Sequence, residues 1–188
     1  MRTILAILLM SSILMAEETA RTLFDFSSPE AAKNWQSVND NVMGGVSEGE
    51  FKITDEKTLE FFGKISLENN GGFASVRTKS KKLGLKKGEV LVARVRGDGR
   101  KYRMNLYVPT FQIAYSYRSV FPTKKDEWIE VELPLGKFEA TSFGRVVKNA
   151  GRVDAPSVNG IGFLLNDKKD GPFKLEVEWI KVATRVAK

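Results

Sequence analysis

Short stretches in which apolar and polar residues alternate constrain the fold of this chain more than any other feature. Eight such segments occur, bounded by Gly, Asn, Asp and Pro, the residues that favour turns. They span residues 58–65, 72–78, 89–97, 101–108, 111–118, 127–133, 158–165 and 173–182. Because helix signals are scarce, the pattern predicts an all-β fold, an antiparallel β-sandwich of the jelly-roll type.

Local signals refine this prediction at three places. Residues 27–30 read Ser-Ser-Pro-Glu, which is typical of the start of a short helix and predicts one near the N-terminus. In the last segment the alternation changes phase after Trp179, which predicts a β-bulge. The dipeptide Asp98-Gly99 joins two predicted strands and favours a hairpin turn between them.

Missing residue types exclude several kinds of chemistry. The chain has 188 residues, a length that suits one domain, and it contains no cysteine and no histidine. Disulfides, thiolate nucleophiles, Ser-His-Asp triads and zinc sites built from Cys or His are therefore excluded. Carboxylate, lysine, tyrosine or arginine chemistry remains, or binding without reaction. We expect a non-enzymatic protein without a cofactor.

Residues 1–16 have the pattern of a secretory signal peptide. Arg2 precedes a mostly apolar stretch over residues 4–15, and Ala16 is the expected last residue before cleavage. The stretch is shorter than the roughly 20 residues that a membrane-spanning helix needs. We therefore expect a mature protein of residues 17–188 that forms a single domain and is periplasmic or secreted. The alternative is a membrane anchor that is retained.

The net charge of the chain is positive, with a formal value of +7. Loss of the leader lowers Lys and Arg from 30 to 29 against 23 acidic residues, which leaves +6. A positive balance can favour nucleic acid, anionic membrane surfaces or acidic ligands. Most lysines lie in short runs typical of solvated loops, and an exported protein does not meet nucleic acid. We therefore expect no nucleic-acid partner.

Four of the predicted strands carry arginine, amide, hydroxyl or aromatic side chains on their polar faces. These positions hold five arginines but no lysine and no acid: Phe73, Ser75, Arg77, Val92, Arg94, Arg96, Arg103, Asn105, Tyr107, Gln112, Ala114, Ser116 and Arg118. If these strands are neighbours, the faces form one surface. The planar fork of arginine suits carboxylates, phosphates or sugar hydroxyls, and an aromatic ring can stack on a ligand. The alternative is an ordinary solvated sheet face.

Two glycine-containing loops are further candidates for a ligand site. Residues 39–47 read Asn-Asp-Asn-Val-Met-Gly-Gly-Val-Ser, and residues 69–73 read Asn-Asn-Gly-Gly-Phe. Glycine pairs permit a positive φ or a close approach of the backbone, and Asn and Asp side chains bond to nearby backbone groups. Either loop can surround a ligand with backbone amides, or can simply connect two strands.

Taken together, these segments resemble the complex I intermediate-associated protein 30 (CIA30) family. The residues that carry the likeness are Trp35 and residues 38–47, 62–77, 96–102, 128–134, 161–163 and 167–176. The resemblance extends over about residues 23 to 183. It implies a galactose-binding-like β-sandwich, a jelly roll that many carbohydrate-binding modules also use. The best-known member is a mitochondrial assembly factor for respiratory complex I that acts through protein contacts. The export-like leader departs from that pattern.

Our first hypothesis is a non-catalytic binding module of the bacterial envelope. We expect it to be a monomer that holds a glycan, an acidic small molecule or an envelope protein on the arginine-rich face. The expected ligand-binding residues are Trp35, Asp40, Arg77, Arg94, Arg103, Asn105, Tyr107 and Arg118. The expected loop-shaping residues are Met43, Gly44, Gly45, Gly72 and Phe73.

Two alternatives belong to other functional classes. The first is an assembly factor or chaperone for respiratory complex I, as the resemblance implies, with a subunit of that complex as partner. The second is a hydrolase that uses a pair of carboxylates, for which Asp40, Asp98, Asp154, Asp167 and Asp170 are loop candidates. The same oxygen-rich loops are the only candidates for a calcium site, and no EF-hand pattern occurs among them.

Overall fold

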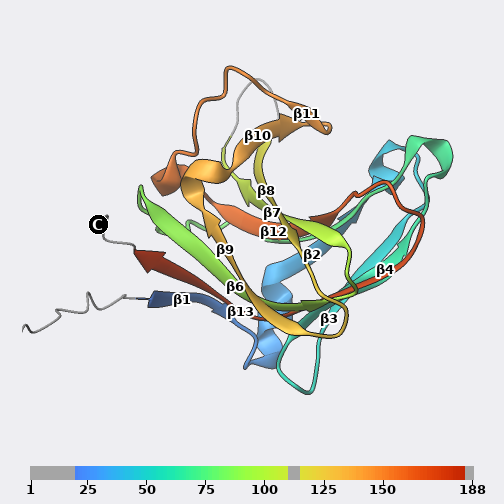
Figure 1. Ribbon diagram of the computed structural model, residues 1–188, viewed down its shortest axis with the longest axis horizontal. Coiled ribbons are helices and arrows are strands. Elements are labelled where there is room, and N and C mark those ends of the chain that lie inside the picture. The colour runs from blue at the N-terminus through green and yellow to red at the C-terminus, as the bar shows by residue number, and fades with distance from the viewer. Residues whose placement is uncertain (1–19, 110–114, 185–188) are drawn as a thin grey trace, which may run out of the picture.

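Figure 1 shows the computed structural model, in which two antiparallel β-sheets pack against each other. The structure describes residues 20–109 and 115–184. The six-stranded sheet has the order β3–β4–β13–β6–β9, and β1 also pairs with β13. Its strands are β1 (Ala20–Asp25), β3 (Glu48–Ile53), β4 (Leu59–Ile65), β6 (Glu89–Gly97), β9 (Trp128–Pro134) and β13 (Gly171–Thr184).

The seven-stranded sheet has the order β11–β10–β8–β7–β12–β5–β2. Its strands are β2 (Trp35–Asn39), β5 (Ala74–Thr78), β7 (Lys101–Tyr107), β8 (Ser116–Pro122), β10 (Glu139–Ser142), β11 (Arg145–Val146) and β12 (Gly160–Leu165). The prediction of an all-β antiparallel sandwich is confirmed.

The predicted N-terminal helix is a six-residue 3₁₀ helix, η1 (Pro29–Asn34). The Oγ atom of Ser28 accepts a hydrogen bond from the backbone N–H of Glu30 at 3.2 Å, as expected of a serine cap. The other 3₁₀ turns of the described residues are η2 (Asp40–Met43), η3 (Glu68–Asn70), η4 (Leu135–Lys137) and η5 (Ala155–Ser157). Within residues 20–109 and 115–184, no helix has the length and apolar character needed to cross a membrane. The predicted leader, residues 1–16, lies outside this part.

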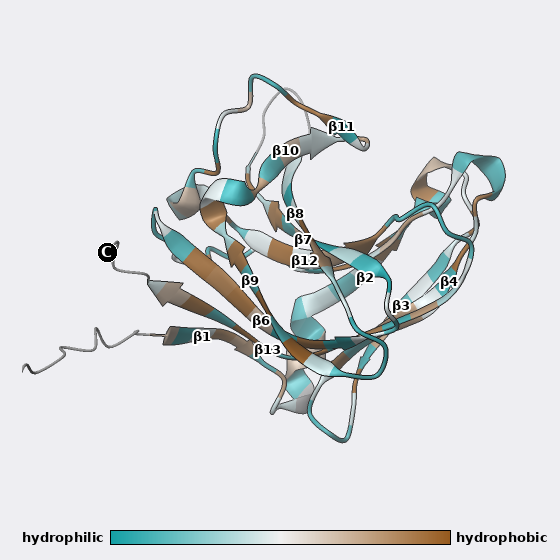
Figure 2. Ribbon diagram, viewed as in Figure 1, coloured by the Kyte–Doolittle hydropathy of each residue, from teal (hydrophilic) through white to brown (hydrophobic). Residues whose placement is uncertain are grey.

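The core lies between the two sheets, as the alternation predicts. On β7, Tyr102, Met104 and Leu106 are fully buried, and on β6 the same holds for Leu91 and Val95. Figure 2 shows the hydrophobic colouring along β6 and along β12. Because side chains alternate along a strand, the positions between these buried residues on β7 point out of the sandwich. That outward face of the seven-stranded sheet is where the polar residues of β7 lie.

The predicted bulge is confirmed, and the predicted hairpin is wrong. The pairing of β13 with β6 shifts register between Val177 and Trp179. At the turn after β6, Gly99 does have a φ of 88°, but β6 pairs with β9 and β13 while β7 pairs with β8 and β12. The Asp98 carboxylate accepts hydrogen bonds from the Tyr102 hydroxyl and the Lys174 N–H, both at 3.0 Å. The chain therefore passes from one sheet to the other at this turn.

The sequence pattern also missed or misplaced several strands. The observed β8 begins at Ser116, whereas the alternation placed a strand over 111–118. Residues 111–114 lie outside the described residues, and with them the predicted polar-face positions Gln112 and Ala114. The strands β1, β2, β3, β10 and β11 were not predicted, because each is short or pairs at the margin of a sheet where alternation is weak.

Candidate functional site

A groove with a volume of about 590 Å³ lies on the outward face of the seven-stranded sheet. Two sets of loops form its walls. The turns η2 and η3 border it at the end of the sheet that holds β2 and β5, and the β10–β11 hairpin borders it at the other end. In Figure 1 the hairpin and these turns stand at opposite ends of the sheet. We call the strand residues between them the floor.

The floor contains a row of polar residues that run across four neighbouring strands. Arg77 of β5 pairs with Gly162 of β12, Gly162 pairs with Asn105 of β7, and Asn105 pairs with Arg118 of β8. A side chain at Gly162 has no room, because its Cβ would lie 2.5 Å from the carbonyl oxygen of Val76. The glycine therefore lets β5 and β12 approach closely between Arg77 and Asn105.

Three half-buried arginines lie on this sheet face, Arg77 and Arg118 in the groove and Arg103 outside its lining, and none makes an ion pair with an acid of the described residues. The Arg77 guanidinium lies 5.4 Å from the ring centroid of Tyr107, within the range of a cation–π contact. The Arg118 Nε donates a hydrogen bond to the Ser116 Oγ at 3.3 Å. Arg103 donates to the Oδ1 atom of Asn166. Each positive charge thus has neutral partners only.

Burial of these charged side chains changes their pKa values. Burial lowers the pKa of Arg103 below its usual value, against the opposing charge of Asp167. Burial is also the main cause that lowers the pKa of Arg118, and the positive charge of Arg103 lowers it further, while Tyr107 opposes the shift. The guanidinium groups stay protonated at neutral pH. Two charges of the same sign therefore lie close together, and neither forms an ion pair among the described residues, since the Asp167 carboxylate that acts on Arg103 is bound by Arg100. This arrangement favours an anion.

Asn105 is buried at the centre of the row, with 2% of its surface exposed. Its Nδ2 donates a hydrogen bond to the Tyr107 hydroxyl at 3.3 Å. Its Oδ1 has no hydrogen-bond partner within the part of the chain that the structure describes. An unpaired buried acceptor costs about 1–3 kcal/mol. A donor brought in beside Asn105 would therefore stabilise the floor.

One wall of the groove is held by the carboxylate of Asp40, which is fully buried. It accepts hydrogen bonds from the N–H and Oγ of Ser47 at 2.9 and 2.6 Å, and from the N–H groups of Gly72 and Phe73 at 2.6 and 3.2 Å. Burial acts to raise the pKa of Asp40, but these hydrogen bonds outweigh it and hold the pKa below its ordinary value of 3.8. Gly45 packs against this carboxyl, since a Cβ there would lie 2.4 Å from Asp40 Cγ. Asp40 thus joins the two glycine loops.

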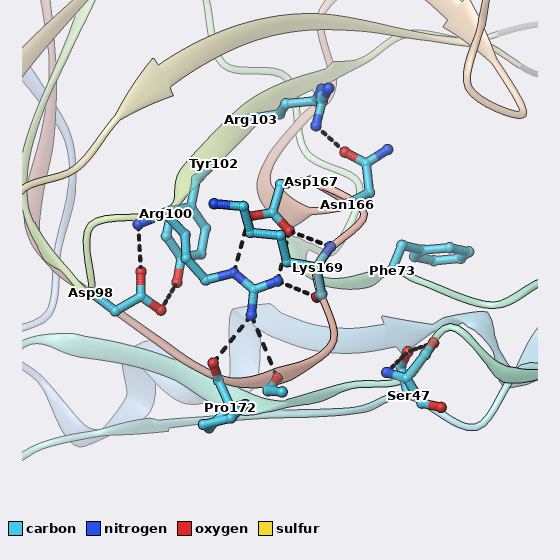
Figure 3. A network of polar contacts seen from close by, with 12 residues as sticks. Ser47, Phe73, Asp98, Arg100, Tyr102, Arg103, Asn166, Asp167, Lys169 and Pro172 are labelled. Carbon is cyan, nitrogen blue, oxygen red and sulfur yellow. Dashed lines mark hydrogen bonds and ion pairs between the residues drawn. The ribbon is translucent and has the colours of Figure 1, made fainter.

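A second polar network fixes the loop after β12, as Figure 3 shows. The Arg100 guanidinium donates to both carboxylate oxygens of Asp167, at 3.0 and 2.6 Å, and to the carbonyl oxygens of Lys169 and Pro172. Burial opposes protonation of Arg100, but the hydrogen bonds and charge of Asp167 prevail and raise the pKa of Arg100. The neighbouring Asn166 lines the groove. The network therefore fixes part of the groove edge.

The structure brings five of the eight predicted ligand-binding residues together on the outward face of the seven-stranded sheet. Arg77, Asn105, Tyr107 and Arg118 line the groove, and Arg103 lies on the same face outside its lining. Three lie elsewhere. Trp35 is buried in the core and stacks on Phe163 with centroids 6.5 Å apart, so it is not available to a ligand. Asp40 is buried beneath the wall. Arg94 projects from β6 on the other sheet, where its Nε lies 2.5 Å from Glu178, because the predicted hairpin does not form.

The predicted loop-shaping residues lie around the groove. Met43, Gly72 and Phe73 line it directly, so the first and last of these offer side chains to a ligand. Gly44 has a φ of 88° at the end of η2, a conformation that favours glycine. Gly45 has no side chain, which leaves room for the carboxyl group of Asp40.

Sequence reasoning missed several lining residues. They are Val42, Tyr115, Thr141, Phe143, Asn166 and Lys168. Phe143 is the one with a usable signal, since a large aromatic residue inside the polar turn Thr-Ser-Phe-Gly is unusual for a solvated loop. The others come from connections whose position depends on the whole sandwich.

The described residues offer little for metal binding or acid–base chemistry. Among them no group of three or more Asp or Glu residues is placed to hold a metal ion. The described lining of the groove contains no carboxylate, so it lacks the acid pair that glycoside hydrolysis uses. Two of the loop carboxylates already have partners: Asp98 accepts a hydrogen bond from the Tyr102 hydroxyl, and Asp167 accepts hydrogen bonds from the Arg100 guanidinium.

Comparison with protein families and curated proteins gives one consistent result. The family model described as "Complex I intermediate-associated protein 30 (CIA30)" matches residues 24–177. The mouse protein "Complex I intermediate-associated protein 30, mitochondrial" is 31% identical over 188 aligned residues, which cover 89% of this chain and 57% of that protein. The protein of the same name from Drosophila melanogaster is 29% identical, with 84% and 61% covered. The chain thus spans little more than half the length of these relatives.

Comparison with solved structures gives the fold. A family 11 carbohydrate-binding module from Clostridium thermocellum, solved with a β-1,3-1,4-mixed-linked tetrasaccharide, has a TM-score of 0.69 at 16% identity, covering 90% of this chain and 98% of that one. A family 30 carbohydrate-binding module of a cellulosomal cellulase from the same organism has a TM-score of 0.60 at 14% identity, with 90% and 99% covered. At such identities the likeness concerns the fold alone.

Proposed function

Because this chain belongs to the CIA30 family, we propose that it is a non-catalytic binding protein that serves in the assembly of respiratory complex I. In this proposal the client is a subunit or an assembly intermediate of the complex, and the groove of the seven-stranded sheet is the binding site. The names of its relatives at about 30% identity support the choice of client.

One observation carries the choice of site. Two half-buried arginines, Arg77 and Arg118, line the groove, and neither forms an ion pair with an acid among residues 20–109 and 115–184. Burial of a charge costs free energy unless an opposite charge or hydrogen bonds compensate for it. An anionic group bound in the groove would provide that compensation at Arg77 and Arg118, whereas water alone would do so only in part.

The composition of the groove supports binding without reaction. The chain has no histidine and no cysteine, and the described lining has no carboxylate. General acid–base catalysis near neutral pH most often relies on these groups. The proposed role therefore requires only that the groove bind a partner.

Deletion of the gene in its source organism tests this proposal. We expect less assembled complex I and more of its partial assemblies on native gels, and we expect wild-type protein to restore the complex. The matched variants are Arg77→Gln with Arg118→Gln in the groove, and Arg94→Gln with Arg96→Gln on the other sheet. Only the second pair should restore assembly. Normal complex I in the deletion strain would contradict the proposal.

A second candidate is an exported glycan-binding module of the bacterial envelope. Two observations favour it: the signal-like residues 1–16 and the likeness of the fold to carbohydrate-binding modules. This candidate predicts a mature protein that begins at Glu17 in the periplasm or outside the cell. Intact mass and cell fractionation distinguish the candidates, since a protein that keeps its first residues on the cytoplasmic side favours complex I assembly.

A further inference from the structure

Apolar side chains stand exposed along both walls of the groove. Met43 and Val42, on the η2 wall, are 53% and 68% exposed, and Phe143, on the opposite wall, is 81% exposed. All three line the groove. Just outside the first wall, Val46 and Leu67 are also exposed. The groove therefore combines a cationic floor with two apolar walls.

This combination distinguishes between classes of partner. Exposed aliphatic side chains and methionine are typical of surfaces that contact other proteins. The groove lining also contains aromatic rings that a sugar ring can contact, those of Phe73, Tyr107, Tyr115 and Phe143, but its arginines without an ion pair favour an anionic partner over a neutral one. A floor without acids accepts carboxylates, and walls of this kind accept apolar side chains. A protein segment that carries both fits the groove better than a neutral glycan.

We propose that the groove binds an extended acidic segment of the client protein, with carboxylates on Arg77 and Arg118 and apolar side chains against the two walls. This proposal rests on the proposed function, in which the groove holds a client. It adds the chemistry of the segment that is recognised.

The spacing of the floor sets the spacing of the segment. Arg77 and Arg118 are separated by three strand intervals in the paired row, or about 14 Å between their backbones. In an extended chain, side chains on one face repeat about every 6.8 Å, so residues i and i+4 are about 13.6 Å apart. Acidic residues at i and i+4 can therefore face the two arginines, while residue i+2 lies above Gly162 and Asn105.

The ends of the segment meet the walls. Residues i−2 and i+6 share the inward face with the two acids and lie beyond Arg77 and Arg118, where the η2 wall and the β10–β11 wall begin. Apolar residues at these positions would cover Met43 and Phe143. A segment of nine residues is about 27 Å long, comparable with the width of the seven-stranded sheet.

A designed peptide tests this geometry. The probe is fluorescein-labelled Leu-Ser-Glu-Ser-Ser-Ser-Glu-Ser-Leu, and its control has glutamine in place of both glutamates. Fluorescence anisotropy measures the dissociation constants for the full-length protein at moderate salt. Because charge-assisted hydrogen bonds contribute most, we expect the control to bind at least about tenfold more weakly. The same loss is expected for the acidic peptide when Arg77→Gln and Arg118→Gln are combined.

The other sheet supplies the matched control, Arg94→Gln with Arg96→Gln, which should retain the affinity of the wild type. Thermal unfolding followed by circular dichroism establishes that each variant is folded. Equal affinity for both peptides would show that the carboxylates are not recognised, and an equal loss in both double variants would show that only net charge matters. Either result would overturn the inference. Binding of the β-1,3-1,4-mixed-linked tetrasaccharide in place of the peptide would also overturn it.

The outcome can be separated from that of the proposed function. If neither peptide binds but the groove variant fails to restore complex I, the groove is the client site and the acidic-segment inference is wrong. If the groove variant restores complex I fully, the proposed function of the groove is wrong as well.

Discussion

Arginines project from the outward faces of both sheets, but their surroundings differ. On the six-stranded sheet, Arg94 lies 2.5 Å from Glu178, and Arg96 lies 2.7 Å from Glu176. Both also lie over the ring of Trp128, with centroid distances of 5.7 and 4.8 Å. On the seven-stranded sheet the floor arginines contact neutral groups only, as far as the described residues extend.

The comparison shows that the two faces differ in whether their arginines form ion pairs, and not in the type of residue that they carry. An arginine with a glutamate on the neighbouring strand completes a structural contact within the protein. A half-buried arginine that has no acid beside it keeps a charge and N–H donors that can bind another molecule. The Asp40 carboxylate in the groove wall accepts hydrogen bonds from backbone N–H groups, and the Asp167 carboxylate is paired with Arg100, so neither forms an ion pair with a floor arginine.

The largest expected effect concerns Asp40. The change Asp40→Ala removes the acceptor of three N–H groups, one buried and two partly buried, and leaves the Ser47 hydroxyl with only the Ser66 carbonyl oxygen. We therefore expect the free energy of unfolding to fall by about 3 kcal/mol or more. Urea unfolding measures the change. Asp154→Ala is the control, because that exposed residue makes no capping bond through its side chain and should change stability by less than about 0.5 kcal/mol. A similar small change for Asp40→Ala would show that the wall does not depend on this carboxylate.

A smaller loss is expected from a methyl group at Gly162, where two strands of the floor approach closely. In Gly162→Ala the new Cβ would lie 2.5 Å from the Val76 carbonyl oxygen and 2.8 Å from Arg77 Cβ. Such overpacking costs about 1–3 kcal/mol. Gly136→Ala provides the comparison, since nothing lies within 4 Å of a Cβ at that position. Equal urea midpoints for the two variants would mean that the strands can separate to accommodate the methyl group.

The two faces should respond in opposite ways to loss of an arginine. Arg96→Gln leaves the buried Glu176 with Lys174 as its remaining cation, at 3.1 Å, and should lower the free energy of unfolding by about 1–2 kcal/mol. Arg118→Gln removes a desolvated charge that no acid balances, and should leave stability unchanged or slightly higher. Thermal and urea unfolding of the two variants make the comparison. A greater loss for Arg118→Gln would show that the floor arginines hold the sheet together.

Acid should weaken the wall through Asp40. The pKa of Asp40 in the folded protein is below its ordinary value of 3.8, so its contribution to stability is complete above that value and is lost as the pH falls through the folded pKa. Asp40→Asn lacks this titration. We therefore expect the stability difference between wild type and Asp40→Asn to shrink below about pH 4, as measured by urea unfolding between pH 7 and pH 3. A difference that stays constant over this range would contradict the assignment.

Much of the fold could be predicted because alternation reports directly on burial. On β7, the buried Tyr102, Met104 and Leu106 and the outward Arg103 and Asn105 follow the predicted faces. What alternation cannot give is the neighbour of each strand. The turn at Asp98-Gly99 has hairpin chemistry, yet side-chain contacts direct the chain into the other sheet.

The candidate site was partly predictable for the same reason. Arg77, Arg103 and Arg118 belong to strands that the topology brings together, whereas Arg94 belongs to a strand that it separates from them. Trp35 and Asp40 are polar or aromatic residues in a loop-rich segment, which is typical of ligand sites and equally of buried structural contacts. Only their burial, against Phe163 and beneath Gly72, decides between these roles.

The most direct test of the difference between the faces is to follow all the arginine side chains in one experiment. In ¹H–¹⁵N NMR spectra of the guanidinium Nε–H groups, the acidic nine-residue peptide should shift the signals of Arg77, Arg103 and Arg118. The signals of Arg94 and Arg96 should stay in place, because their glutamate partners already occupy them. Shifts of equal size on both sheets, or shifts confined to Arg94 and Arg96, would contradict the account.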